Sequence, residues 1–238
     1  MFGLGTIANV GAIVVGGLLG CAFGGALRPR CRETVQAAMG TVVVFIGGAG
    51  TFGEMQKGLV AGGILMVVCS LALGSVLGDW WDLDGRIERL GLWLRRKTGN
   101  ERDASFANAF VTASLTVCVG AMAIVGSIQD GLQGDPSILY VKSLLDGVIV
   151  FVYVSSLGRG AIFSALPVLV LQGGVTLFAR FLEPVMTPAA MANLGAVGNL
   201  LICCVGINLL RGASMPPIRV ADMLPALLVA VAWAFVAG

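Results

Sequence analysis

Long apolar runs alternate with short polar segments along almost the whole chain. Each run is close to 20 residues, the length that an α-helix needs to cross about 30 Å of hydrocarbon. Charges, prolines and turn residues bound the runs and mark where each helix ends. We therefore predict an all-α, polytopic membrane protein with about eight transmembrane helices, at residues 3–27, 34–53, 58–78, 104–127, 137–158, 160–182, 190–210 and 218–237.

The basic residues between these runs orient the spans, because cytoplasmic loops of membrane proteins are rich in Lys and Arg. With the N-terminus outside, 12 of the 15 basic residues fall in loops on the inner side. Only Lys57, Lys142 and Arg180 lie outside or near the outer side. Dropping one span would move Arg211 and Arg219 to the other side, so we predict an even number of helices with both termini outside.

The segment 79–103 is the one sizeable loop, and it carries 12 of the 28 charges of the chain. Leu83, Ile87, Leu90 and Leu94 recur at the spacing of one helical face, with charged residues opposite. The pattern predicts a cytoplasmic amphipathic helix that lies on the inner leaflet. A helix that docks a partner protein is the alternative.

Composition narrows the function classes further. The chain is 57% hydrophobic and 12% charged, whereas soluble domains carry about 25% charged residues. These values exclude a soluble enzyme, a nucleic-acid binder and a disordered chain. The absence of His removes imidazole metal ligands and His-based catalysis. The six cysteines form no CxxC pair and read as small apolar residues. We therefore expect neither a cofactor nor a metal, and no enzymatic activity.

Two distant stretches of the chain resemble each other. Pro184 follows Pro29 by 155 residues, and Gly195 follows Gly40 by the same 155 residues. The match predicts repeats over 1–78 and 160–238 in a 3+2+3 arrangement within a single transmembrane domain, 1–238. Five spans separate the starts of the two repeats, so the repeats run through the membrane in opposite directions. Inverted repeats are typical of alternating-access transporters, although a duplication without transport leaves the same trace.

The polar residues inside the predicted spans mark a candidate site. Asp135 and Pro136 have the order of a helix start, with a capping carboxylate followed by a first-turn proline. Lys142 then lies in the membrane, and Asp146 follows one turn deeper on the same face. Such a pair neutralises two charges that are costly in lipid, so an ionisable pair there indicates function. A static brace between helices is the alternative.

Several uncharged polar residues accompany this pair. Asn9 and Asn208 supply amides, and Ser137 and Ser143 supply hydroxyls. The predicted substrate or ion site therefore comprises Lys142, Asp146, Asp135, Ser137, Ser143, Asn9 and Asn208. The predicted outer loop 128–137 contains Asp130 and Asp135 but no basic residue, which favours a cation. Lys142 favours an anion, so the sign of the substrate stays open.

The motifs extend over essentially the whole chain and resemble the YqgA/YdfK-like family of bacterial inner-membrane proteins. The most specific block is the segment 134–147, with GDPSIL followed by Lys142-Ser143 and by Leu145-Asp146-Gly147. The resemblance implies a multi-pass protein of the bacterial inner membrane. Members of this family are described as membrane proteins of unknown function, so it implies neither a substrate nor a site.

These observations favour a secondary transporter that moves a small solute or ion by alternating access, coupled to protons or sodium. An ion channel or pore is one alternative, and a membrane scaffold without transport is another. The expected partners are the lipid bilayer, the small solute or ion and a second copy of the chain. The glycine-rich helix faces and the small size of the chain favour a homodimer.

Overall fold

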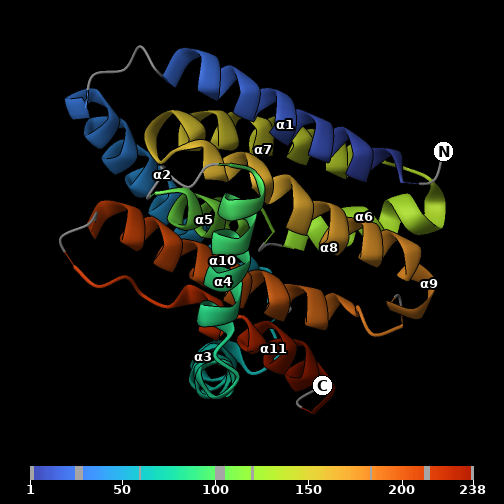
Figure 1. The fold of residues 1–238 in the computed structure, drawn as a ribbon. Helices are drawn as coiled ribbons and strands as arrows, with labels where there is room; N and C mark the ends of the chain where they lie inside the picture. Colours follow the sequence, from blue (N-terminus) through green and yellow to red (C-terminus); the bar gives the residue numbers. More distant parts are fainter. Residues whose placement is uncertain are drawn as a thin grey trace. The chain divides into compact units, whose positions relative to one another are not determined.

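The computed structural model describes residues 3–24, 29–58, 60–99, 105–118, 121–182, 184–211 and 215–236. Every regular element in this part of the chain is helical (Figure 1), which confirms the predicted all-α class. The elements are α1 (Leu4–Gly24), α2 (Pro29–Gln56), α3 (Gly63–Trp80), α4 (Leu83–Lys97), α5 (Phe106–Cys118), α6 (Ala121–Gln133), α7 (Ser137–Ser156), η1 (Arg159–Ser164), α8 (Ala165–Leu177), α9 (Ala179–Leu182), α10 (Pro188–Arg211), η3 (Val220–Met223) and α11 (Pro225–Val236).

Among the residues that the structure describes, six helical segments are long and apolar enough to cross a membrane: α1, α2, α3, α7, η1 with α8, and α10. Helices α5 and α6 would make a seventh span if counted together, although the two are bent by 73° at a short break. The region 104–127, predicted as one continuous span, is therefore divided. The segment Val220–Val236 is a shorter apolar helix. The structure thus supports six to seven spans by length and composition, and the count of eight stays a prediction.

Large apolar side chains cover the outside of these helices. Phe45, Leu144, Val170 and Leu228 are each more than 70% exposed, on four different helices. A soluble protein rarely leaves contiguous apolar surface of this kind uncovered. In a bilayer the same side chains face lipid, and the helices satisfy their backbone hydrogen bonds internally.

The contacts divide the chain into two compact units, and the first comprises 1–38, 87–118 and 122–182. Its centre is α1 lying along α7. A Cβ atom on Gly16 would collide with the backbone oxygen of Gly147, and one on Gly20 would lie 2.7 Å from the backbone oxygen of Phe151. The glycine face of α1 therefore packs directly on α7, as small residues allow in membranes.

Helix α5 is held in the same unit by η1 and α4. The rings of Phe106 and Phe163 lie 5.2 Å apart, and a Cβ atom on Gly160 would collide with the backbone oxygen of Phe106. Leu94 of α4 is buried against Phe106 and Phe110. The predicted amphipathic helix is thus present, and its apolar stripe packs partly on α5.

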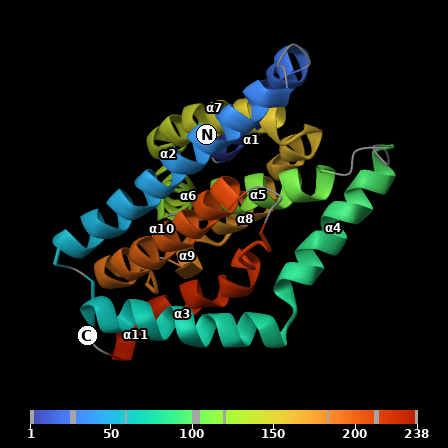
Figure 2. The ribbon, with the colours of Figure 1, turned by 90° about the vertical axis from the view of Figure 1, so that its left-hand side faces the viewer.

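The second unit comprises 39–86, 119–121 and 183–238. Its core joins α3, α10 and α11 (Figure 2) through Met66, Val67, Ala196, Val197, Ala226 and Ala230. Glycines again allow close contact, since a Cβ atom on Gly74 would collide with the backbone of Ala226. Helix α2 approaches α10 where a Cβ atom on Gly40 would lie 3.0 Å from the backbone oxygen of Gly206.

Helices that the predicted repeat would relate to each other also contact each other. Helix α1 packs on α8 in the first unit, and α3 packs on α11 in the second. Helix α2 contacts α10 through the Gly40–Gly206 approach. A two-fold relation between 1–78 and 160–238 is compatible with such pairs, and the repeat stays a prediction.

The α1–α7 contact gives a matched pair of glycine substitutions. We expect Gly16→Ala to destabilise the protein by about 1–3 kcal/mol, the usual effect of overpacking, because the new methyl group meets the Gly147 backbone. Gly11→Ala adds the same methyl group to α1 with no atom within 4 Å. Thermal unfolding in detergent should show a lowered transition only for Gly16→Ala. Equal transitions for both variants would contradict this packing.

Candidate functional site

Lys142 and Asp146 form an ion pair inside the first unit. The Lys142 Nζ lies 2.5 Å from Asp146 Oδ2, and their side chains are only 9% and 5% exposed. The two residues are one turn apart on α7, the spacing that brings side chains together on a helix. The predicted pairing is therefore confirmed, with both charges removed from solvent and lipid.

Lys142 also binds the end of another helix. Its Nζ donates a hydrogen bond of 2.8 Å to the backbone oxygen of Val117, in the last turn of α5. Carbonyl groups in the last turn of a helix lack an intrahelical partner, and they carry the negative end of the helix dipole. The ammonium group thus bridges a carboxylate and the terminus of α5 beside the 73° bend between α5 and α6.

Two amides complete the surroundings of Asp146. The Asn9 side-chain nitrogen donates to Asp146 Oδ2 at 2.9 Å and to Gln172 Oε1 at 3.2 Å. Both amides are fully buried, and they bring α1 and α8 to the pair on α7. The Asn9 Oδ1 and the Gln172 Nε2 have no hydrogen-bond partner. The cluster therefore keeps one unused acceptor and one unused donor, although buried polar groups are normally satisfied.

The other residues predicted on α7 have local roles. The Ser143 hydroxyl donates to the backbone oxygen of Leu139 at 2.6 Å. Ser137 lies at the exposed start of α7, where its backbone N–H and its hydroxyl donate to Asp135 Oδ1 at 3.0 and 2.5 Å. The carboxylate thus receives the N–H of the first helical residue, although the N-cap position is Pro136 and not Asp135 as predicted. These contacts join Asp135, in the turn before α7, to Ser137, the first residue of α7.

The hydroxyl and the backbone N–H of Ser137 hold the pKa of Asp135 below its ordinary value, and the amide of Gln129 adds to this effect. Hydrogen bonds to the charged form of a carboxyl favour that form. Because the folded-state pKa is lowered, the carboxylate supports this turn above the ordinary pKa of Asp. The support disappears as the pH falls through the lowered pKa.

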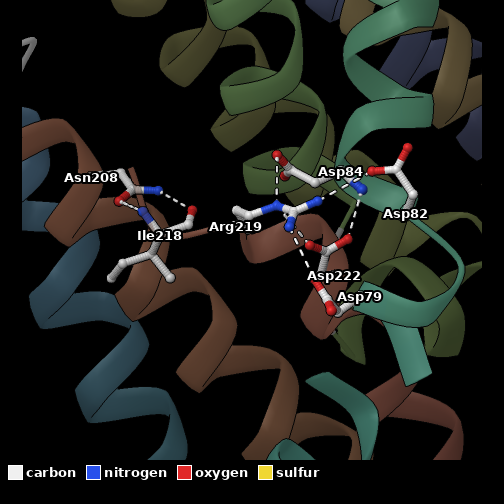
Figure 3. Close-up of polar contacts among 7 residues, drawn as sticks. All are labelled: Asp79, Asp82, Asp84, Asn208, Ile218, Arg219 and Asp222. Carbon is white, nitrogen blue, oxygen red and sulfur yellow. Dashed lines mark hydrogen bonds and ion pairs between the residues drawn. The ribbon is translucent and has the colours of Figure 1, made fainter. Parts of the chain in front are cut away.

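Asn208 lies in the second unit, where it bonds to a nearby backbone segment, and its predicted place in the site stays a prediction. Its Nδ2 donates to the backbone oxygen of Ile218 at 2.8 Å, and its Oδ1 accepts the N–H of Ile218 at 2.7 Å. Figure 3 shows this two-way clamp. Both polar ends of the amide are used, because an amide matches a backbone peptide unit. Asn208 therefore fixes the segment before η3.

A second ionic cluster, missed by sequence reasoning, surrounds Arg219 in the same unit (Figure 3). The guanidinium lies 3.0 Å from Asp79, 3.2 Å from Asp82 and 2.9 Å from the Oδ2 of Asp222. Asp222 is 4% exposed and accepts the backbone N–H of Asp84 at 2.9 Å. The cluster ties the α3–α4 turn to η3. Its two segments, 79–84 and 219–222, are about 140 residues apart in sequence, so no local pattern reveals that they meet.

Asp130 was predicted in an exposed outer loop, and the structure corrects this. It lies in α6, because this helix continues beyond residue 127, where the predicted span ended. The side chain is fully buried. Its Oδ2 accepts the backbone N–H of Gly5 at 3.1 Å, at the start of α1. Its Oδ1 has no hydrogen-bond partner.

Burial of the Asp130 carboxylate with a single hydrogen bond is energetically unfavourable if the group is charged. Removing a carboxylate from water costs several kcal/mol even after relaxation, whereas a helix N-terminus returns about 0.3–2 kcal/mol. In the part of the chain that the structure describes, no group of three His, Cys, Asp or Glu side chains is arranged to hold a metal ion. Asp130 is therefore a lone buried acid with one unsatisfied oxygen.

Comparisons with known proteins agree with the membrane architecture. The family described as "Protein of unknown function (DUF554)" matches residues 4–235. The "Uncharacterized protein YqgA" of Escherichia coli K12 is 29% identical over 234 residues, which cover 95% of this chain and 94% of the relative. The "Uncharacterized membrane protein YdfK" of Bacillus subtilis 168 is 26% identical over 225 residues, covering 94% and 93%. No solved structure matches the chain.

The buried pair predicts a characteristic pattern of stabilities. Lys142→Met alone leaves Asp146 as an unpaired buried charge, and we expect a loss of about 3–5 kcal/mol. Asp146→Leu alone strands Lys142 and should have a similar effect. The double variant removes both charges, so most of the loss should be recovered. Thermal unfolding of the four proteins in one detergent measures this pattern, and strictly additive losses would contradict a buried pair.

Proposed function

This chain belongs to the DUF554 protein family, and from that premise we propose that it is a secondary transporter of a small solute or ion. It is a multi-pass membrane protein, as its apolar helices and the membrane-protein relative indicate. Family membership brings no activity with it. The proposal therefore rests on the chemistry of the Lys142–Asp146 cluster.

The observation that carries the proposal is a buried ion pair whose surroundings are incompletely satisfied. A purely structural pair would be expected to use its neighbouring polar groups fully. Here Asn9 Oδ1 and Gln172 Nε2 are buried without partners beside the pair. Intramembrane ionisable residues mark ion and substrate pathways by default. Asn9 Oδ1 could accept a hydrogen bond from a small ligand and Gln172 Nε2 could donate one to it, and the two bonds together would orient the ligand.

The bend between α5 and α6 supports the same proposal. Secondary transporters place substrates and coupling ions at interrupted helices, where backbone ends line the site. Lys142 Nζ contacts the Val117 oxygen at such an end. Release of Lys142 would expose both the carboxylate of Asp146 and this carbonyl.

Competition for Asp146 provides a simple coupling mechanism. A proton or a cation that binds Asp146 neutralises the carboxylate and weakens its attraction for Lys142. The freed ammonium group can then take the carboxylate of an anionic solute, or it can move away from the end of α5. Either change alters the contacts among α1, α5, α7 and α8, which is the kind of rearrangement that alternating access requires.

For the topology we propose eight crossings, with α5–α6 as one bent span and Val220–Val236 as the last. The 17 residues of the last segment give a length of about 25 Å at 1.5 Å per residue. This length is sufficient for a slightly thinned bilayer. Both termini then lie outside the bacterial inner membrane, and the basic loops lie inside.

The test begins with a thermal-shift screen of ions and metabolites on the purified chain. The strongest stabilising compound is then used for uptake into proteoliposomes. We expect the Lys142→Met, Asp146→Leu double variant to remain folded but to lose at least 90% of the uptake. The matched control replaces the ion pair of Lys57 and Glu54, which lie 2.8 Å apart with side chains 57% and 19% exposed, by Met and Leu, and it should retain uptake.

Two outcomes would contradict the proposal. Full uptake by a stable double variant would show that the pair is a structural brace. A steady single-channel conductance of the wild-type protein in planar bilayers would instead identify a pore.

A further inference from the structure

Three helices of the first unit meet at Asp130. Its Oδ2 accepts the N–H of Gly5 on α1 at 3.1 Å. The next residue on α6, Gly131, is so close to α8 that a Cβ atom there would lie 2.5 Å from the backbone oxygen of Thr176. The start of α1 and the end of α8 therefore both approach the same turn of α6.

Two unpartnered hydroxyl groups lie at these same contacts. Thr6 follows Gly5 on α1, and its side chain and that of Thr176 are buried at 3% and 2% exposure. Within the described part of the chain, the two Oγ1 atoms and Asp130 Oδ1 have no hydrogen-bond partner. Hydroxyl groups within reach of a carboxylate normally donate to it. These three buried oxygens without partners therefore belong to residues at or next to the α1–α6–α8 contacts.

The register of α1 against α8 predicts that the two threonines lie at the same level of the helix pair. Gly17 of α1 lies against Ile162, and Asn9 bonds to Gln172, so the two segments run in opposite directions. Thr6 is three residues before Asn9, and Thr176 is four residues after Gln172. Both threonines are thus about one turn, or 5.4 Å, from the Asn9–Gln172 contact, on the same side of it.

We propose that Asp130, Thr6 and Thr176 form a sodium-binding site one helical turn away from the Lys142–Asp146 cluster. The ligands are a carboxylate oxygen and two hydroxyl oxygens, the hard donors that alkali and alkaline-earth cations prefer. One carboxylate balances one positive charge, which matches a monovalent cation. A calcium site needs 6–8 oxygen ligands, usually with several carboxylates.

The ion would also resolve the unfavourable burial of Asp130. Gly5 satisfies one carboxylate oxygen, and the cation would satisfy the other oxygen together with both hydroxyls. Bound sodium would fasten α1 and α8 to α6, next to the amides that contact Asp146. The site itself stands on these contacts alone, and its use as a coupling-ion site rests on the proposed transport function.

The test measures sodium binding by the purified full-length chain in detergent. Thermal unfolding is followed in NaCl and in choline chloride of equal ionic strength, and binding of radioactive sodium is measured directly. We expect a saturable rise in the unfolding temperature with Na⁺ for the wild type.

Variants assign this effect to the three residues. Asp130→Asn should abolish the sodium response, and Thr6→Val or Thr176→Val should weaken the apparent affinity at least tenfold. The threonine variants keep the side-chain shape, so they test the site even if Asp130→Asn does not fold. Matched controls are Glu33→Gln and Thr34→Val, both at exposed positions of α2, which should respond to sodium as the wild type does.

An unchanged sodium response in the Asp130 and threonine variants would overturn the proposal. An unfolding temperature that depends on Asp130 but not on sodium would also overturn it. Sodium binding without any solute uptake would refute the transporter while leaving this site intact. Solute uptake without sodium binding would refute this site while leaving the proposed transporter intact.

Discussion

The cost of an unpaired charge away from water is the constraint on which the first unit depends. Lys142 and Asp146 lie 2.5 Å apart and share the surrounding dipoles of Val117 and Asn9, which offsets the cost of burying two ionisable side chains. This requirement fixes α1, α5 and α7 relative to one another. The glycine face of α1 allows the close approach that brings Asn9 within reach of Asp146. Beside the pair, Asn9 Oδ1 and Gln172 Nε2 make no hydrogen bond within the described residues. For this reason we interpret the pair as a functional site.

The sequence allowed prediction of the features that depend on short-range geometry. Lys142 and Asp146 are four residues apart on one apolar run, so their pairing follows from the helical repeat. The contact of Asp135 with the first turn of α7 follows from the preference of carboxylates for helix starts. The apolar runs also located most helices, because hydrophobic length is set by the thickness of the bilayer.

Features that depend on contacts between distant segments could not be predicted. Asp130 resembled a loop residue because two glycines and two glutamines lie close to it, yet packing of α1 and α8 on α6 buries it. Asn208 resembled a site residue, and only the fold shows that Ile218 uses both of its polar ends. The bend between α5 and α6 occurs without a proline or a charge in 116–122, so the apolar pattern alone does not mark it.

The most direct measurement is the reactivity of the three lysines, Lys57, Lys97 and Lys142, toward a membrane-permeant amine reagent. Reductive methylation of the wild-type protein in vesicles, followed by mass spectrometry, compares them within one chain without mutation. The account predicts that Lys142 stays largely unmodified at rest while Lys57, with its side chain 57% exposed, reacts readily. A sodium or proton gradient should then increase the modification of Lys142. Modification of Lys142 at rest as fast as that of Lys57 would contradict the buried ion pair.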